Sequence, residues 1–361
     1  MSAVRVELLR PSARGYVAAR WLALETRAGA VRLPCRWAWT AAWLEHFGPV
    51  VDHRFALATE RGRLIGAALV TRDVVRAGPL PVRRLHVGTA GEPPGESVYV
   101  ERNGLLAAPG RGPAFAAALV RRLGEEGGWD ALCLDGFVPE EATAFAGTGL
   151  SLTLDAQPCW VTDLWGAQDV ADLFTVNTRH QIRRNERRVG DVRVRWARGR
   201  TDALAMLDEM MELHQRRWNM AGEPGVFAAP RFAAFHRALV ARLAPSGEVW
   251  IARVSAGGTL LSSFYGFMEG GRMACYQSGR ALLPDHRVAS GLIGEVAVMR
   301  SARARGVAIY DPLAGDTHAK RRLSTRREEL VWGVARRGRA RWAVHDVARG
   351  ARRRVMAVLA A

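Results

Sequence analysis

Lysine is almost absent from this chain of 361 residues: Lys320 is the only one, and the other 51 basic side chains of the Lys+Arg total are arginine. A GC-rich genome accounts for arginine in place of lysine through codon use, but it does not account for an excess of cations over anions. The net charge is +17, and residues 161–361 carry most of it, with 33 arginines and one lysine against 19 acidic residues. This imbalance favours a polyanionic partner.

Long hydrophobic runs and paired cysteine motifs are also missing. No apolar run reaches the roughly 18 residues that span a bilayer, and the N-terminus lacks the apolar centre of a signal peptide, so we expect a cytoplasmic protein without a transmembrane segment. Cys35, Cys133, Cys159 and Cys275 are scattered without CxxC spacing. This pattern predicts buried free thiols and neither a disulfide framework nor a metal site.

The chain is longer than one ordinary core of roughly 100–200 residues, which predicts two domains. In the first half, the pattern predicts two strands within 54–73, a third strand within 87–107, a helix over 110–128 and a strand over 130–137. In the second half, it predicts three antiparallel strands within 248–280, a helix over 286–306 and a strand within 307–315. Both halves therefore follow the same order of elements.

This repetition predicts a duplicated α/β unit with mixed, mainly antiparallel sheets flanked by helices. Asp135 and Asp311 fall at equivalent places, each in the strand that follows the long helix. We place the domain boundary near residue 165, which gives domains 1–165 and 166–361.

A basic helix is expected between the two repeats. Its arginines recur at helical spacing and would form a cationic strip on neighbouring faces: Arg179, Arg183, Arg184, Arg187 and Arg188. A solvated helix face is the usual interpretation, but like charges four residues apart repel, and phosphate binding would offset that cost. The arginines near the C-terminus, from Arg336 to Arg354, extend the basic surface or form a basic tail.

The sequence HRVASG opens the helix expected over 286–306. Backbone N–H groups in the first turn of a helix form a natural phosphate site, to which His286 and Arg287 would add positive charge, with Ser290 and Gly291 at the turn itself. The alternative is an ordinary helix start with Ser290 near the cap.

The duplicated unit and the motifs TRHQIRRNERR, HQRRWNMAGEPGVF, HRVASGL and YDPLAGDTHAKRRLS resemble the GNAT acyltransferases of the FemAB-like and CelD-like branch. The resemblance implies two tandem GNAT-like domains and transfer of an acyl group from acyl-CoA or aminoacyl-tRNA to an amine. This chain has Ala319 where the family has an aromatic residue before the lysine. It also has Ser290 where the CoA-binding loop has its first glycine.

The resemblance also implies roles for individual residues. Lys320 would supply a compact positive charge to a phosphate or to the oxyanion of the transferring acyl group. Asp316 and Asp311 would orient the amine or relay its proton, although a structural role at the strand end explains Asp311 slightly better and a structural role explains Asp316 about as well. His318 would be a general base if the segment is extended, because it would then lie on the same side as Lys320. The remaining candidates are Arg280, Arg321 and Arg322 for the donor phosphates, and Tyr276 and Gln277 for the substrate.

We therefore expect an amide-forming N-acyltransferase without a tightly bound cofactor, and the charge favours aminoacyl-tRNA as its donor. The acceptor would be an amine of a small molecule or of a cell-envelope precursor. An acyl-CoA-dependent N-acyltransferase and a catalytically silent RNA-binding module remain as alternatives. The sequence leaves the oligomeric state open, and a monomer is compatible with it.

Overall fold

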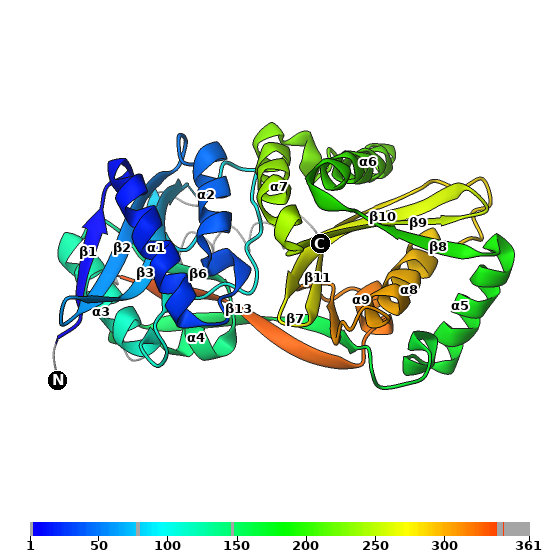
Figure 1. Ribbon diagram of the computed structural model, residues 1–361. Helices are drawn as coiled ribbons and strands as arrows, with labels where there is room; N and C mark the ends of the chain where they lie inside the picture. The colour runs from blue at the N-terminus through cyan, green and yellow to red at the C-terminus, as the bar shows by residue number, and fades with distance from the viewer. Residues whose placement is uncertain (1–2, 77–79, 146–147, 338–341, 343–361) are drawn as a thin grey trace, which may run out of the picture. The chain divides into compact units, whose positions relative to one another are not determined.

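The computed structural model describes residues 3–76, 80–145, 148–337 and 342, and it divides the chain into two compact units (Figure 1). The first unit is Met1–Ala156 with Leu330–Ala361, and the second is Gln157–Glu329. The second unit therefore does not extend to residue 361 as the sequence suggested. The reason is the last strand, β13 (Arg326–Arg336), whose residues from Val331 onward pair with a strand of the first unit.

The two units repeat one order of elements, which confirms the predicted duplicated α/β fold. The first unit contains β1 (Arg5–Leu9), α1 (Arg14–Ala28), α2 (Trp37–His46), β2 (Asp52–Glu60), β3 (Arg63–Val75), β4 (Val82–Val87), β5 (Leu106–Ala107), α3 (Gly112–Glu126), β6 (Ala131–Phe137) and α4 (Pro139–Thr143). The second contains α5 (Val176–Val189), β8 (Val192–Trp196), α6 (Gly199–Met220), α7 (Pro230–Leu243), β9 (Val249–Ala256), β10 (Thr259–Glu269), β11 (Arg272–Arg280), α8 (Ser290–Arg303), β12 (Ile309–Asp311) and α9 (His318–Arg322). Strand β7 (Leu152–Asp163) leads from one to the other, and short 3₁₀ turns lie at η1 (Pro11–Ala13), η2 (Leu33–Cys35), η4 (Val170–Leu173), η5 (Val226–Ala228) and η6 (Ala244–Ser246).

The third strand of the first unit lies earlier than the sequence predicted. It is β4, whereas most of 88–105 runs as a loop, with an isolated bridge from Asn103 to Phe137 and the short strand β5 at its end. Gly88, Gly91 and Gly95 have positive φ values of 102°, 80° and 82°, and two prolines lie between the last two of them. This backbone cannot follow a strand, which explains the error.

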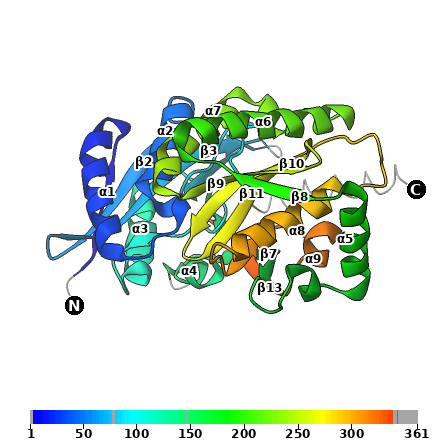
Figure 2. The same ribbon diagram turned by 45° about the vertical axis from the view of Figure 1, so that its right-hand side comes forward.

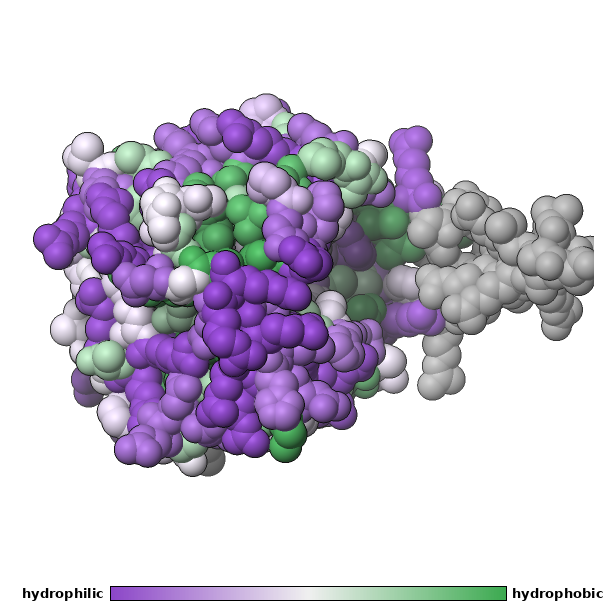
Figure 3. Space-filling model, turned by 90° about the vertical axis from the view of Figure 1, so that its right-hand side faces the viewer, coloured by the Kyte–Doolittle hydropathy of each residue, from purple (hydrophilic) through white to green (hydrophobic). Residues whose placement is uncertain are grey.

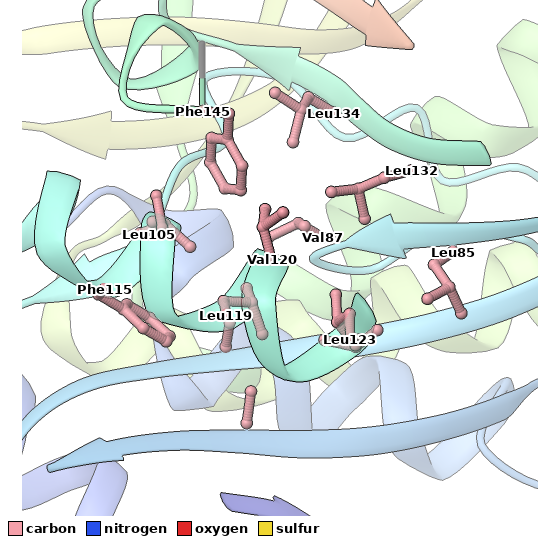
Figure 4. Packing of buried hydrophobic residues seen from close by; sticks show 14 of the residues in the cluster. Leu85, Val87, Leu105, Phe115, Leu119, Val120, Leu123, Leu132, Leu134 and Phe145 are labelled. Carbon is pink, nitrogen blue, oxygen red and sulfur yellow. The ribbon is translucent and has the colours of Figure 1, made fainter. Parts of the chain in front are cut away.

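In the first unit the strands lie in the order β1-β2-β3-β4-β6-β13, and only β4 and β6 are parallel neighbours. Strand β2 alternates between the two faces of this sheet. Phe55 contacts Trp37 of α2, while Ala56 and Ala58 belong to the core beneath α3. Figure 4 shows the α3 side chains of this core packing against strand residues.

In the second unit the order is β7-β12-β11-β10-β9-β8, with β11 and β12 as the parallel pair. Helices α5, α8 and α9 lie on one side of this sheet, and α6 and α7 lie on the other (Figures 1 and 2). Trp250, Ala252 and Val254 recur with a period of two on the face that packs against α8. The core therefore fixes both β11 and the start of α8, which together frame the site described below.

Within the described residues, no helix is both long enough and apolar enough to cross a membrane. All four cysteines are free thiols; three are buried, and Cys275 is half-buried. The C-terminal arginines Arg339, Arg341, Arg352, Arg353 and Arg354 lie outside the described residues.

The first unit buries a histidine between two carboxylates. The His86 ring lies 2.7 Å from the Asp135 carboxylate through Nδ1 and 3.3 Å from the Asp73 carboxylate through Nε2, and Arg84 also pairs with Asp73. Burial alone would lower the pKa of His86, but Asp135 and Asp73 more than offset it and raise the pKa from 6.5 to about 9. His86 is therefore a buried cation that joins β4 to β6 and β3.

This network predicts how stability depends on pH. Folded His86 keeps its proton up to about pH 9, whereas the unfolded chain releases it near 6.5. The free energy of unfolding should therefore fall by on the order of 2–3 kcal/mol as the pH rises through this range, as measured by urea denaturation. His86→Gln should lose this slope, and His180→Gln, at an exposed site on α5, should keep it. The interpretation fails if all three proteins show the same pH dependence.

Candidate functional site

A pocket of about 400 Å³ lies in the second unit where β11 and β12 separate. The two strands pair only from Arg272 to Ala274 on β11, opposite Ile309 to Asp311 on β12. The chain turns away at Pro312, and β11 continues past it to Arg280. A register shift also marks a bulge, because Tyr265 pairs with Gln277 while Gly266 pairs with Cys275. Bulges of this kind redirect side chains next to binding sites.

Two charged side chains hold the loop that follows β12. The buried Asp311 carboxylate accepts hydrogen bonds from the Leu313 amide at 2.8 Å and from the Arg272 guanidinium at 2.7 Å. The Lys320 ammonium donates to the carbonyl oxygens of Leu313 at 3.1 Å and Ala314 at 2.6 Å. Leu313 itself has a φ of 63°, which is an uncommon conformation for a leucine. The two contacts therefore fix a strained loop at one wall of the pocket.

The rim of the pocket is cationic. Arg280 lies against Gly291 at the start of α8: a methyl group on Gly291 would lie 2.9 Å from the Arg280 Nη1 and would overlap the side-chain stem. No hydrogen bond or ion pair joins Arg280 to any residue that the structure describes. Burial and the nearby charge of Arg217 lower its pKa, so an anion beside it would be stabilising. Arg322, also in the lining, donates to Gln181 at 2.9 Å.

The interior of the pocket contains Glu295, Tyr310 and Cys275. Burial raises the pKa of the Glu295 carboxyl, while the Tyr310 hydroxyl and the charge of Lys320 oppose the shift. Burial also raises the pKa of the Cys275 thiol to about 12, so the thiol stays protonated at neutral pH. Cys275 is therefore a poor nucleophile.

The first turn of α8 lacks a side-chain cap of its own, because its N-cap residue is Ala289. The Ala289 amide instead donates to the Asn185 side chain of α5 at 2.8 Å. Ser290 begins the helix and is buried. His286 is exposed, and Arg287 pairs with its loop neighbour Asp285 at 2.9 Å. Of this segment, only Gly291 and Leu292 line the pocket before Glu295.

Helix α5 forms as predicted, and its arginines differ in their partners. Arg179 and Arg183 share Asp172, at 3.2 and 3.4 Å. Arg188 donates to the backbone carbonyl of Arg287 at 3.0 Å, whereas Arg184 and Arg187 are exposed and make no ion pair with any described residue. Glu186, the one acid within the strip, is used by Arg300 instead. Figure 3 faces the side of the unit that carries α5 and shows mostly hydrophilic side chains there.

The structure brings together some of the predicted site residues and separates others. The pocket lining includes these predicted residues: Lys320, Arg280, Tyr276, Gln277, Gly291 and Arg322. Asp311 lies buried below it in the pair with Arg272. Asp316 is exposed and accepts hydrogen bonds from Trp160 at 3.0 Å and Arg321 at 2.7 Å. The catalytic and binding roles of these residues stay predictions.

The condition for His318 as general base is not met. That role required an extended segment from His318 to Lys320, but the segment is helix α9, capped by the Thr317 side chain, which accepts from the Lys320 amide at 3.2 Å. Two residues apart on a helix, the two side chains do not share a face. His318 is exposed and is not part of the pocket lining.

Sequence reasoning missed Glu295, although a signal was present. It is the single acidic residue in α8 and stands within the apolar stretch GLIGEVAVM. An acidic side chain among residues that form a core needs a polar environment. Here that environment is the pocket.

Comparisons with known proteins agree with this geometry. Residues 176–321 match the model of the acetyltransferase (GNAT) domain family. No curated protein matches the chain. Among solved structures, FemX is 12% identical with a TM-score of 0.56, and the match covers 88% of this chain and 95% of that one.

Two further solved structures are similar. The C-terminal domain of a putative lysylphosphatidylglycerol synthetase from Agrobacterium fabrum is 11% identical with a TM-score of 0.53, and the match covers 92% of this chain and 94% of that one. L-PGS from Bacillus licheniformis is 11% identical with a TM-score of 0.51, covering 89% and 98%. At such identities these matches show a common fold.

The contact between Gly291 and Arg280 yields a prediction. Gly291→Ala should displace the Arg280 guanidinium from the first turn of α8 and weaken the binding of inorganic pyrophosphate by about tenfold, or about 1.4 kcal/mol, in isothermal titration calorimetry. Folding should be unaffected, because the displaced atoms belong to a flexible side chain. Gly124→Ala, in open space on α3, is the matched control and should bind as the unaltered protein does. If Gly291→Ala binds pyrophosphate as tightly as the unaltered protein, Arg280 is not part of the anion site.

Proposed function

We propose that this chain, whose residues 176–321 match the acetyltransferase (GNAT) domain family, is an acyltransferase that transfers an aminoacyl group from aminoacyl-tRNA to an amine, forming an amide. The phosphates nearest the aminoacylated 3′ end of the tRNA would bind at Arg280 and the first turn of α8. The acyl group would enter the pocket between β11 and β12. The acceptor amine would belong to a small molecule or to a cell-envelope precursor.

The observation that carries this proposal is the contact of α5 with the pocket. Gln181 accepts from Arg322, Asn185 accepts from the Ala289 amide, and Arg188 donates to the Arg287 carbonyl. The exposed arginines of α5 therefore continue the cationic rim beyond the pocket. The phosphates of a polynucleotide would contact these additional arginines, whereas a small acyl carrier would extend no further than the pocket rim.

The chemistry needs a neutral amine and stabilisation of the oxyanion that forms at the carbonyl. The amine attacks the ester carbonyl, a carbon–nitrogen bond forms, the carbon–oxygen bond to the ribose breaks, and the amine proton ends on the ribose oxygen. Lys320 uses two of its three donors on the loop carbonyls, so one remains for an anion in the pocket. Since the Cys275 thiol stays protonated, direct transfer is favoured over a covalent thioester intermediate.

The similar folds give the proposal modest further support. One is described as a putative lysylphosphatidylglycerol synthetase, a name that contains an aminoacyl group. Acyl-CoA is the second candidate donor, because its phosphates would also suit Arg280 and the uncapped turn of α8. It would leave the α5 arginines without a ligand.

The donor assay tests the proposal. We expect purified protein to transfer labelled aminoacyl groups from total charged tRNA to members of a panel of amines, and to lose this activity after ribonuclease treatment. Consumption of acetyl-CoA with no effect of ribonuclease would exclude the tRNA donor. Persistent RNA binding without consumption of either donor would identify a silent RNA-binding module.

The basic helix generates a second prediction. Replacing Arg184 and Arg187 with glutamate should weaken tRNA binding by about tenfold or more and reduce its dependence on salt concentration, as measured by filter binding. A matched variant with glutamate at Arg193 and Arg200 changes the net charge equally at exposed sites outside α5 and should have a much smaller effect. Equal losses in both variants would show that only the net charge matters.

A further inference from the structure

Among the residues that the structure describes, Glu295 has no salt-bridge partner, although it lies in a pocket lined by cations. Lys320, Arg280 and Arg322 all share the lining with it. Within the described residues, none of these three cations lies within ion-pair distance of the Glu295 carboxylate. Lys320 donates to two backbone carbonyls, Arg322 donates to the Gln181 side-chain amide, and Arg280 makes no hydrogen bond or ion pair there. Elsewhere in this unit buried acids are paired, as Asp311 is with Arg272 at 2.7 Å. The pocket thus keeps opposite charges apart.

Separated charges in one pocket suit a ligand that carries both signs. The rim cations would meet a phosphate, and Glu295 would meet an ammonium group. Without a ligand, burial raises the pKa of the Glu295 carboxyl because it disfavours the charged form. A bound ammonium group would offset that cost. An acetyl group offers no cation to Glu295.

The spacing supports an aminoacyl ester of a nucleotide. Gly291, where Arg280 lies, and Glu295 are four residues apart on α8, which corresponds to about 6 Å along the helix. In an aminoacylated terminal adenosine, about eight bonds of roughly 1.5 Å separate the 5′-phosphorus from the α-nitrogen, so the two charges can span this distance when the chain is bent. In an acyl-CoA, about fourteen bonds separate the nearer phosphorus from the acyl carbonyl, so the acyl group reaches well past Glu295.

We infer that Glu295 binds the α-ammonium group of the aminoacyl donor and thereby selects aminoacyl donors over simple acyl donors. This inference rests on the proposed function, since it takes the donor to be aminoacyl-tRNA. The bound ammonium stays protonated, so the donor's own amine cannot act as the nucleophile. Its positive charge also draws electrons from the adjacent ester carbonyl and favours attack by the acceptor.

The test uses stable donor fragments, so it needs no acceptor. The probes are 3′-amino-3′-deoxyadenosine 5′-phosphates acylated with glycine, alanine, serine, leucine or lysine, each compared with its N-acetylated form. The unaltered protein should bind the free-amine form of at least one probe about 10- to 100-fold more tightly, which is typical of a hydrogen bond between charged groups. Glu295→Gln should abolish this preference while binding the N-acetylated form as before.

Glu212→Gln, which removes an exposed carboxylate paired with Arg216 on α6, is the matched control and should keep the preference. Thermal melting should not fall in Glu295→Gln, because a carboxylate with a raised pKa does not stabilise the folded chain.

The outcomes separate the two proposals. If charged tRNA serves as donor but Glu295→Gln keeps the free-amine preference, the role of Glu295 is overturned and the proposed function stands. If Glu295→Gln weakens both forms equally, Glu295 acts on something other than the ammonium group, and the inference is again overturned. If only acyl-CoA is consumed and no probe binds, both the tRNA donor and the inference fall.

Discussion

The separation of β11 from β12 after three residue pairs is the constraint on which the site depends. A strand that loses its neighbour exposes backbone groups and tends to close again. Here the Asp311 carboxylate accepts a hydrogen bond from the Leu313 amide, and the Lys320 ammonium donates to two loop carbonyls. The loop cannot relax back into the sheet, and the pocket between the strands persists.

Electrostatics in this unit divides into charges that are used for structure and charges that are left for a ligand. Arg272, Arg300 and Arg326 each lie between two carboxylates, so their charge is balanced within the fold. Arg280, Arg184 and Arg187 have no such partners among the described residues. Part of the unbalanced positive charge of this unit therefore lies at the pocket rim and on the adjoining face of α5.

Periodicity was sufficient to predict the duplicated order of elements, because amphipathic helices and alternating strands leave a local pattern in the sequence. It failed at β4, where the glycines that follow mark a loop, and at α9, a five-residue helix too short to show a period. The predicted boundary also missed the return of β13 to the first unit, since strand pairing between distant segments leaves no local signal. Glu295 left a local signal as an acid in an apolar stretch, but the cations that share its pocket come from other segments and could not be predicted from that stretch.

The loop that follows β12 explains why residue 320 is a lysine and not an arginine. Lys320 places a compact ammonium between two carbonyl oxygens at 2.6 and 3.1 Å. A methyl group on Gly315, whose φ is 129°, would already lie 3.3 Å from this nitrogen. A guanidinium is planar and wider, with donors in a fixed fork that does not match two carbonyls converging on one point. At this loop the compact ammonium of lysine therefore suits the two carbonyls better than the guanidinium of arginine.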